Sequence, residues 1–112
     1  MEIKTETMKR CVLITLSGQI DSNCAPDLEE ELVGLIEAGK RNLVLNLRDV
    51  TFVSSAGLSS LISAQIKAHR RVPKGEVVIS EIPAKLKDTF ELVGFHHLFQ
   101  FYASDTEAVG SF

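Results

Sequence analysis

The chain has 112 residues, of which 45% are hydrophobic and 24% charged, and its formal net charge is -3. This length fits one domain, residues 1–112, with enough apolar residues for a hydrophobic core. The negative charge disfavours nucleic acid as a partner, because neutralising phosphates requires a basic surface. No apolar run reaches the roughly 18 residues of a membrane span, and the charged start MEIKTETMKR has no apolar stretch of signal-peptide length. We therefore expect a cytoplasmic protein that binds neither nucleic acid nor a membrane.

The cysteines and the basic residues indicate no metal site and no nucleic-acid site. Cys11 and Cys24 are too few for a disulfide framework, and no Cys/His spacing is typical of zinc binding. Cys11 lies in an apolar run, which predicts a buried thiol. We expect no metal and no cofactor. The nearest approach to a basic patch is predicted to be a solvated helix end and consists of Lys67, His69, Arg70, Arg71 and Lys74.

The first half of the chain predicts a hairpin, a helix and a buried strand. EIKTE alternates in polarity, the run CVLITLSG is apolar, and the polar TMKR between them is typical of a turn. In SNCAPDLEEELVGLIEAG, Pro26 suits the start of a helix and Gly39 its end. NLVLNL, residues 42–47, is nearly all apolar and predicts a central strand covered on both faces. The inward face of the helix is predicted to be Leu28, Leu32, Leu35 and Ile36.

The second half predicts three helices and two strands. A helix is expected to run from Ser54 or Ser55 to about residue 68, and the strand EVVIS follows it. Pro83 is expected to begin a third helix that ends at Gly94, followed by the short strand LFQFY. Ser104 has the spacing of a capping box with Glu107, which predicts a last helix. The residues expected to face inward from these helices are Leu58, Leu61, Ile62, Ile66, Leu86, Phe90 and Val93, with Ser59, Ser60, Ser63 and Lys67 on the outer side of the first of them.

The predicted order of elements is β-β-α-β-α-β-α-β-α, which indicates an α/β fold. Strands that alternate with helices favour a parallel sheet, and the first hairpin adds an antiparallel pair. We therefore expect a small mixed β-sheet with about four helices.

The stretch VTFVSSAGLSSLI, residues 50–62, holds the candidate functional residues. Ser54 or Ser55 is expected to cap the following helix, and Ala56 and Gly57 leave the N–H groups of its first turn open to an approaching molecule. A serine nucleophile would require Gly-x-Ser-x-Gly, which is absent, and a phosphate-binding loop would require a glycine-rich run and a lysine. A serine that is itself phosphorylated on an interaction surface uses every feature of the stretch.

The same stretch resembles the STAS domain (sulfate transporter and anti-sigma factor antagonist), specifically the small bacterial anti-sigma factor antagonists. LVLNLRDVTFVSSAGLSSLI is similar to the strand, turn and helix start of that family. LSGQID resembles a second landmark before the first helix, and PAKLKDTFELVGFHHLFQFYASDTEAV resembles the closing elements. The resemblance covers nearly the whole chain. The residues that match the turn and the helix start are Asp49, Thr51, Phe52, Ser55, Ala56, Gly57 and Leu58.

The resemblance implies a function in partner switching. In the family, the unphosphorylated antagonist binds an anti-sigma factor that is also a serine kinase of the histidine-kinase-like ATPase type. Phosphorylation, here at Ser55, ends that binding and a serine phosphatase restores it. Where the family usually has an aspartate this chain has Ser54, which is a second candidate for phosphorylation. The implied partner-binding residues are Asp21, Ser54, Ser55, Ala56 and Gly57.

Alternatives remain open for the protein and for single residues. The chain could be a STAS scaffold or regulatory subunit of another signalling or lipid-transport complex without a phosphoswitch, or an enzyme with a nucleophilic serine. Asp21 either caps the first helix or contacts the partner. Asp49 is expected to be a turn residue that binds its own backbone, and Phe52 and Phe90 are expected in the core.

Overall fold

The structure, a computed structural model, describes residues 1–112. Five strands form one sheet with the order β1-β2-β3-β4-β5. β1 is antiparallel to β2 and every other neighbouring pair is parallel, as the sequence predicts. The elements are β1 (Glu2–Thr7), β2 (Val12–Ile20), α1 (Ala25–Glu37), β3 (Asn42–Val53), α2 (Ser55–His69), β4 (Glu76–Ser80), α3 (Ala84–Leu92), the 3-10 helix η1 (Phe95–His97), β5 (Phe101–Tyr102) and α4 (Asp105–Gly110).

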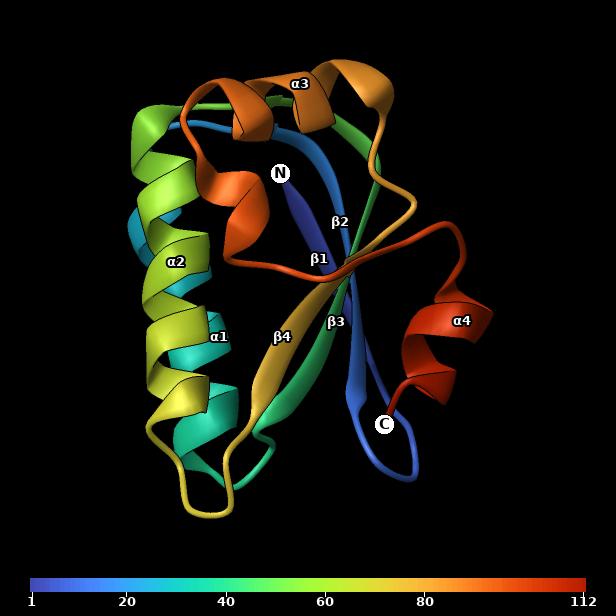
Figure 1. The fold of residues 1–112 in the computed structure, drawn as a ribbon. Coiled ribbons are helices and arrows are strands. Elements are labelled where there is room, and N and C mark those ends of the chain that lie inside the picture. Colours follow the sequence, from blue (N-terminus) through green and yellow to red (C-terminus); the bar gives the residue numbers. More distant parts are fainter.

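The helices lie in two layers around the sheet. α1 and α2 cover one face, α3 lies at the end where the parallel strands finish, and α4 packs on the opposite face (Figure 1). Because the strands follow one another in order across the sheet, right-handed crossovers place α1 and α2 on the same side. The main core of 21 buried residues lies under α1, α2 and α3, and a smaller cluster of four lies under α4.

Strand β3 is longer than the sequence predicts. It continues past Leu47 to Val53, because its second half pairs with the end of β2 through Ser17–Asp49, Gly18–Val50 and Ile20–Val53. The register shifts twice along this pairing. Asp49 is therefore an exposed strand residue rather than a turn residue, and its carboxylate accepts no hydrogen bond from its own backbone.

Some residues expected in the core are exposed. Phe52 is 49% exposed and Ile66 is 45% exposed, and Val93 at the end of α3 is also exposed. The irregular pairing of β3 turns Phe52 away from the core, whereas Phe90 is fully buried as expected. The residue before Ile66 in α2, Gln65, is buried in its place. The side-chain amide of Gln65 forms hydrogen bonds with the backbone of Val77 and Leu98. Ser60, expected on the outer side of α2, is buried.

The last elements and the cysteines agree with the sequence in outline. Only Phe101–Tyr102 of LFQFY is strand, because η1 occupies the preceding residues. The side chain of Ser104 accepts a hydrogen bond from the N–H of Glu107 and caps α4 as predicted. Cys11 is buried, and this burial raises the pKa of its thiol. None of the helices combines the length and the apolar character that crossing a bilayer requires.

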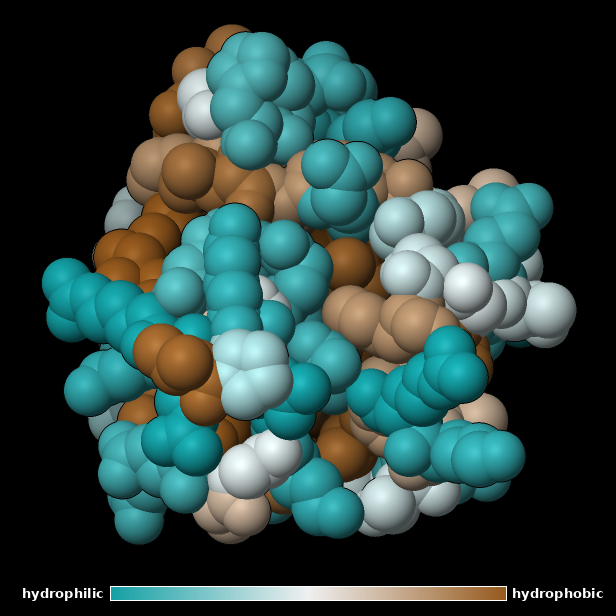
Figure 2. Space-filling view, turned by 60° about the horizontal axis from the view of Figure 1, so that its bottom comes forward, coloured by the Kyte–Doolittle hydropathy of each residue, from teal (hydrophilic) through white to brown (hydrophobic).

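The surface at one end of the molecule is mainly hydrophilic. Figure 2 views the structure with the lower end of Figure 1 turned forward, and hydrophilic side chains there surround small separate hydrophobic areas. The loops before β2, β3 and β4 lie at this end, because the parallel strands all begin there.

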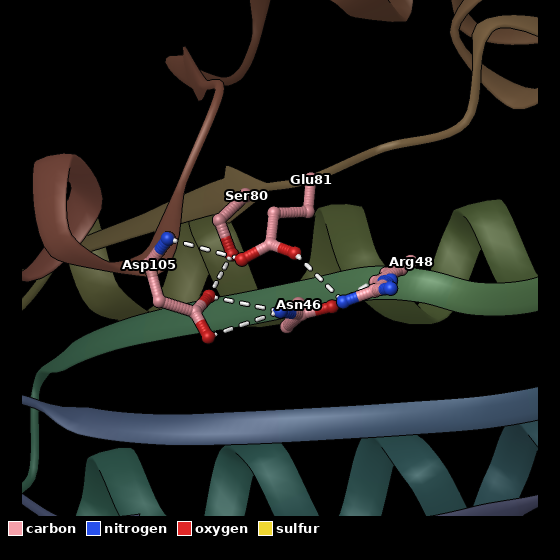
Figure 3. A network of polar contacts seen from close by, with 5 residues as sticks. All are labelled: Asn46, Arg48, Ser80, Glu81 and Asp105. Atoms are coloured by element: carbon pink, nitrogen blue, oxygen red, sulfur yellow. Dashed lines mark hydrogen bonds and ion pairs between the residues drawn. The ribbon is translucent and has the colours of Figure 1, made fainter.

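Helix α4 is joined to the sheet by a polar network (Figure 3). The carboxylate of Asp105 accepts hydrogen bonds from the side-chain amide of Asn46, at 2.9 and 3.1 Å, and from the hydroxyl of Ser80. Asn46 and Ser80 are both buried polar residues of the sheet. Glu81 accepts the N–H of Asp105 at 3.2 Å and lies 4.0 Å from Arg48. The network therefore satisfies polar groups that would otherwise be buried without partners.

Candidate functional site

The start of α2 lies beside the turn that leads into α1. Ile20, the last residue of β2, pairs with Val53, the last residue of β3. The N–H of Ser54 donates to the carbonyl of Ile20 at 2.8 Å, so the chain after β3 is held against the end of β2. Asp21, which follows Ile20 in the chain, is therefore brought close to Ser54. The end of β2 and the start of α2 lie at the upper end of the molecule in Figure 1.

Ser54 is the N-cap of α2. Its backbone is extended, with φ -77° and ψ 171°, and its hydroxyl oxygen accepts a hydrogen bond from the N–H of Gly57 at 3.1 Å. A cap of this kind stabilises a helix by about 1 kcal/mol. The structure thus decides which of the two serines performs the capping.

Ser55 is the first residue of α2 and is exposed. Its hydroxyl forms no hydrogen bond within the chain, whereas that of Ser54 is held by the helix. The N–H groups of Ser55 and Ala56 have no partner inside the helix, because they belong to its first turn. A free hydroxyl therefore stands at the positively polarised end of a helix.

Gly57 has a packing role that no local sequence pattern indicates. It is buried, and a Cβ placed on it would lie 2.8 Å from Cγ2 of Ile20 and 2.9 Å from the carbonyl oxygen of Ile20. Its N–H is bonded to Ser54 rather than open to an approaching molecule. The glycine lets α2 begin in close contact with the end of β2.

Asp21 closes the turn before α1 and does not occupy its N-cap position. Its Oδ1 accepts the N–H groups of Asn23 at 3.0 Å and Cys24 at 3.2 Å. The N-cap of α1 is Cys24, which forms no side-chain capping bond. Hydrogen bonding by the backbone N–H of Cys24, and more weakly of Asn23, lowers the pKa of the Asp21 carboxyl.

A shallow groove runs between α1 and α2 and begins next to this site. Ala56, Ser59 and Ser63 line it from α2. The buried hydroxyl of Ser60 donates to the carbonyl of Ala25 at 2.8 Å and so joins the two helices. Neither Ser55 nor a histidine lines the groove, and no histidine forms a hydrogen bond with Ser54 or Ser55. The arrangement lacks the base that a nucleophilic serine requires.

The fold has counterparts in known proteins. Residues 2–108 match the model of the STAS domain. The chain belongs to the STAS domain family. BtrV of Bordetella bronchiseptica, provisionally named an anti-sigma factor antagonist, is 29% identical over 112 residues, which is 100% of this chain and 95% of BtrV. The anti-sigma-B factor antagonist of Staphylococcus aureus is 28% identical over 88% of this chain and 89% of its own.

Solved structures of STAS proteins share the whole fold. An anti-sigma factor antagonist from Mycobacterium paratuberculosis superposes with a TM-score of 0.83 and 21% identity, over 98% of this chain and 92% of its own. The Bacillus cell fate determinant SpoIIAA in its phosphorylated form has a TM-score of 0.76 and 17% identity, over 98% of each chain. At sequence identities of 21% and 17%, these comparisons show that the fold is shared and nothing beyond it.

Proposed function

We propose that this STAS domain is an anti-sigma factor antagonist that acts by partner switching. In this proposal the unphosphorylated protein binds an anti-sigma factor that is also a serine kinase of the histidine-kinase-like ATPase type. Phosphorylation of Ser55 ends the binding and a serine phosphatase restores it. The protein is then a regulator and not an enzyme, and its location is cytoplasmic because sigma factors act there.

One observation carries the choice of residue. Ser55 is exposed with an unengaged hydroxyl, whereas the hydroxyl of Ser54 already accepts the N–H of Gly57. The names of two relatives, BtrV and the Staphylococcus aureus protein, support the choice of partner class. The phosphorylated form of SpoIIAA, a protein of the same fold, supports a phosphoswitch.

The proposed surface lies around Ser55. Asp21 contributes a carboxylate whose Oδ1 is fixed by two backbone N–H groups. Ala56, which follows Ser55 in α2, is half-buried. Gly57 lies behind them as the packing residue. Ser54 stands where the family usually has an aspartate, so the anti-sigma factor that binds this protein meets a neutral hydroxyl at this position.

Phosphorylation of Ser55 would change the surface without unfolding the domain. A phosphoserine brings about -1.5 to -2 charges, and the N–H groups of a helix start stabilise an anion. The helix therefore tolerates the modification. A partner packed against this helix start would have to bury the dianion, which is costly without a matching cation.

Labelling with ATP tests the proposal. The kinase from the same organism should add one phosphate to the purified protein, and peptide mapping should place it on Ser55. Ser55→Ala should abolish the labelling, and Ser54→Ala should retain it. Labelling that stays intact in Ser55→Ala contradicts the proposed site. A complete lack of labelling would favour a STAS scaffold without a phosphoswitch.

A further inference from the structure

The basic residues of the chain are gathered at the end opposite Ser55. Three loops meet there, with the sequences MKRC (8–11), AGKR (38–41) and RRVPKG (70–75). They hold seven of the 12 Lys and Arg residues and none of the 15 Asp and Glu residues. The rest of the chain has five basic and 15 acidic residues, an excess of ten negative charges. We call the three loops the basic end.

Backbone contacts hold these loops side by side. The N–H of Glu76 donates to the carbonyl of Arg41 at 3.2 Å, and a Cβ on Gly75 would collide with that carbonyl oxygen. The side-chain amide of Asn42 donates to the carbonyl of Arg10 at 3.3 Å. The seven cations therefore belong to one contiguous surface.

No acidic side chain of the molecule pairs with the cations of the basic end, and the guanidinium of Arg10 donates one hydrogen bond to the main-chain oxygen of Phe112 at 3.3 Å. None of its seven cations forms a salt bridge, because the two salt bridges of the structure join Arg48 to Glu81 and His69 to Glu76. Glu37 and Glu76 flank the loops in sequence, and the Glu76 carboxylate is already bonded to Gln65 and His69. Six of the seven cations are exposed, and Arg41 is half-buried.

The tip of the longest loop is apolar. Val72 is 95% exposed, and Arg70, Arg71 and Lys74 surround it in sequence. An exposed apolar side chain brings nothing to the binding of phosphates along a nucleic acid. It does have a use at a lipid surface, where cations meet headgroups and an apolar tip enters the interface.

We propose that the basic end binds the surface of an anionic lipid membrane peripherally. The loops bring the cations to the headgroups, and Val72 enters the interface. The excess of negative charge on the rest of the chain repels the same membrane and so orients the molecule, with Ser55 directed away from the lipid. The sequence alone predicts a solvated helix end and no membrane partner, because only the fold brings residues 8–11 and 38–41 to the loop after α2.

Sedimentation with lipid vesicles tests this binding. The two preparations are phosphatidylcholine alone and phosphatidylcholine with about 30% phosphatidylglycerol. The protein should sediment only with the anionic vesicles, and added salt should weaken the binding. Arg70→Gln/Arg71→Gln should lower the partition coefficient about 30-fold, since each cation near such a surface contributes a factor of roughly five.

Two further variants make the test specific. Lys4→Gln/Lys85→Gln removes the same charge outside the basic end and should leave the binding unchanged. Val72→Ser should weaken vesicle binding roughly three- to tenfold, because it removes apolar area from the interface. None of these side chains forms a salt bridge, so thermal unfolding should be unaffected.

Three results would overturn the proposal. The first is a lack of sedimentation with anionic vesicles at low salt, and the second is equal loss in the two charge variants. The third is binding to a short DNA duplex but not to the vesicles, with the same DNA affinity for Val72→Ser as for the wild type. That result would assign the basic end to nucleic acid.

Discussion

At the scale of single residues, the two adjacent serines of α2 have separate roles. Ser54 is held as the cap by the N–H of Gly57, and Ser55 has an exposed, unengaged hydroxyl. Ser54→Ala should therefore lower the free energy of unfolding by about 1 kcal/mol. Ser55→Ala should change it by less than about 0.5 kcal/mol. Urea unfolding of both variants measures the difference, and equal losses would contradict the assignment of the cap.

Gly57 is explained by packing rather than by backbone freedom. Gly57→Ala should destabilise the protein by about 1–3 kcal/mol, because the new Cβ meets the backbone and side chain of Ile20. Gly34→Ala in α1 is the matched control, since apart from its chain neighbours and the backbone of its own helix no atom lies within 4 Å of its Cβ position. It should stabilise by about 0.5–1 kcal/mol through helix propensity. Thermal unfolding distinguishes the two, and a stabilising Gly57→Ala would refute the close contact.

Asp21 makes part of the stability depend on pH. Its pKa is lowered in the folded state by the N–H groups that it accepts, so the ionised carboxylate favours folding. This contribution is present above the pKa of the unfolded carboxyl, about 4, and disappears as the pH falls through the lower folded value. The stability difference between the wild type and Asp21→Ala should therefore shrink in acid. A difference that grows on acidification would contradict the turn geometry.

At the scale of elements, α4 depends on one carboxylate. Asp105→Ala would leave the amide of Asn46 and the hydroxyl of Ser80 buried without their partner. It should destabilise by about 1–3 kcal/mol and increase hydrogen exchange in α4 first. Ser104→Ala, which removes only the cap, should cost about 1 kcal/mol. Exchange that rises equally in α1 would show that the network does not serve α4 specifically.

The elements were largely predictable, because each leaves a local pattern in the sequence. The period of Leu28, Leu32 and Ile36 predicts α1, and all three are buried. The end of β3 was missed, because its pairing with β2 is irregular and leaves no such pattern in residues 48–53. The exposure of Phe52 follows from the same register shifts.

Within the candidate site, the sequence indicated the residues but not their division of roles. The motif points to both serines, and only the backbone of Ser54 decides which one caps. The packing of Gly57 on Ile20 and the network of Asp105 join residues far apart in the chain. Contacts of this kind depend on the tertiary fold, so no local spacing reveals them.

At the scale of the whole molecule, the two ends differ in chemistry. The carboxyl ends of the parallel strands carry the helix start with Ser55, and their amino ends carry the basic loops. The proposed partner and the proposed lipid surface therefore occupy opposite ends (Figure 1). The two could be engaged together, because neither blocks the other.

The start of α2 is proposed here as the surface that an anti-sigma factor binds, and a negative charge at Ser55 is proposed to end that binding. Calorimetry with the anti-sigma factor from the same organism tests it most directly, using wild type, Ser55→Asp and Thr106→Asp. Thr106 is exposed on α4, on the other face of the sheet, and receives the same charge as a control. Ser55→Asp should weaken binding at least about tenfold, roughly 1.4 kcal/mol, and Thr106→Asp should leave it unchanged. Equal affinity of all three proteins for the anti-sigma factor would show that the start of α2 is not the binding surface.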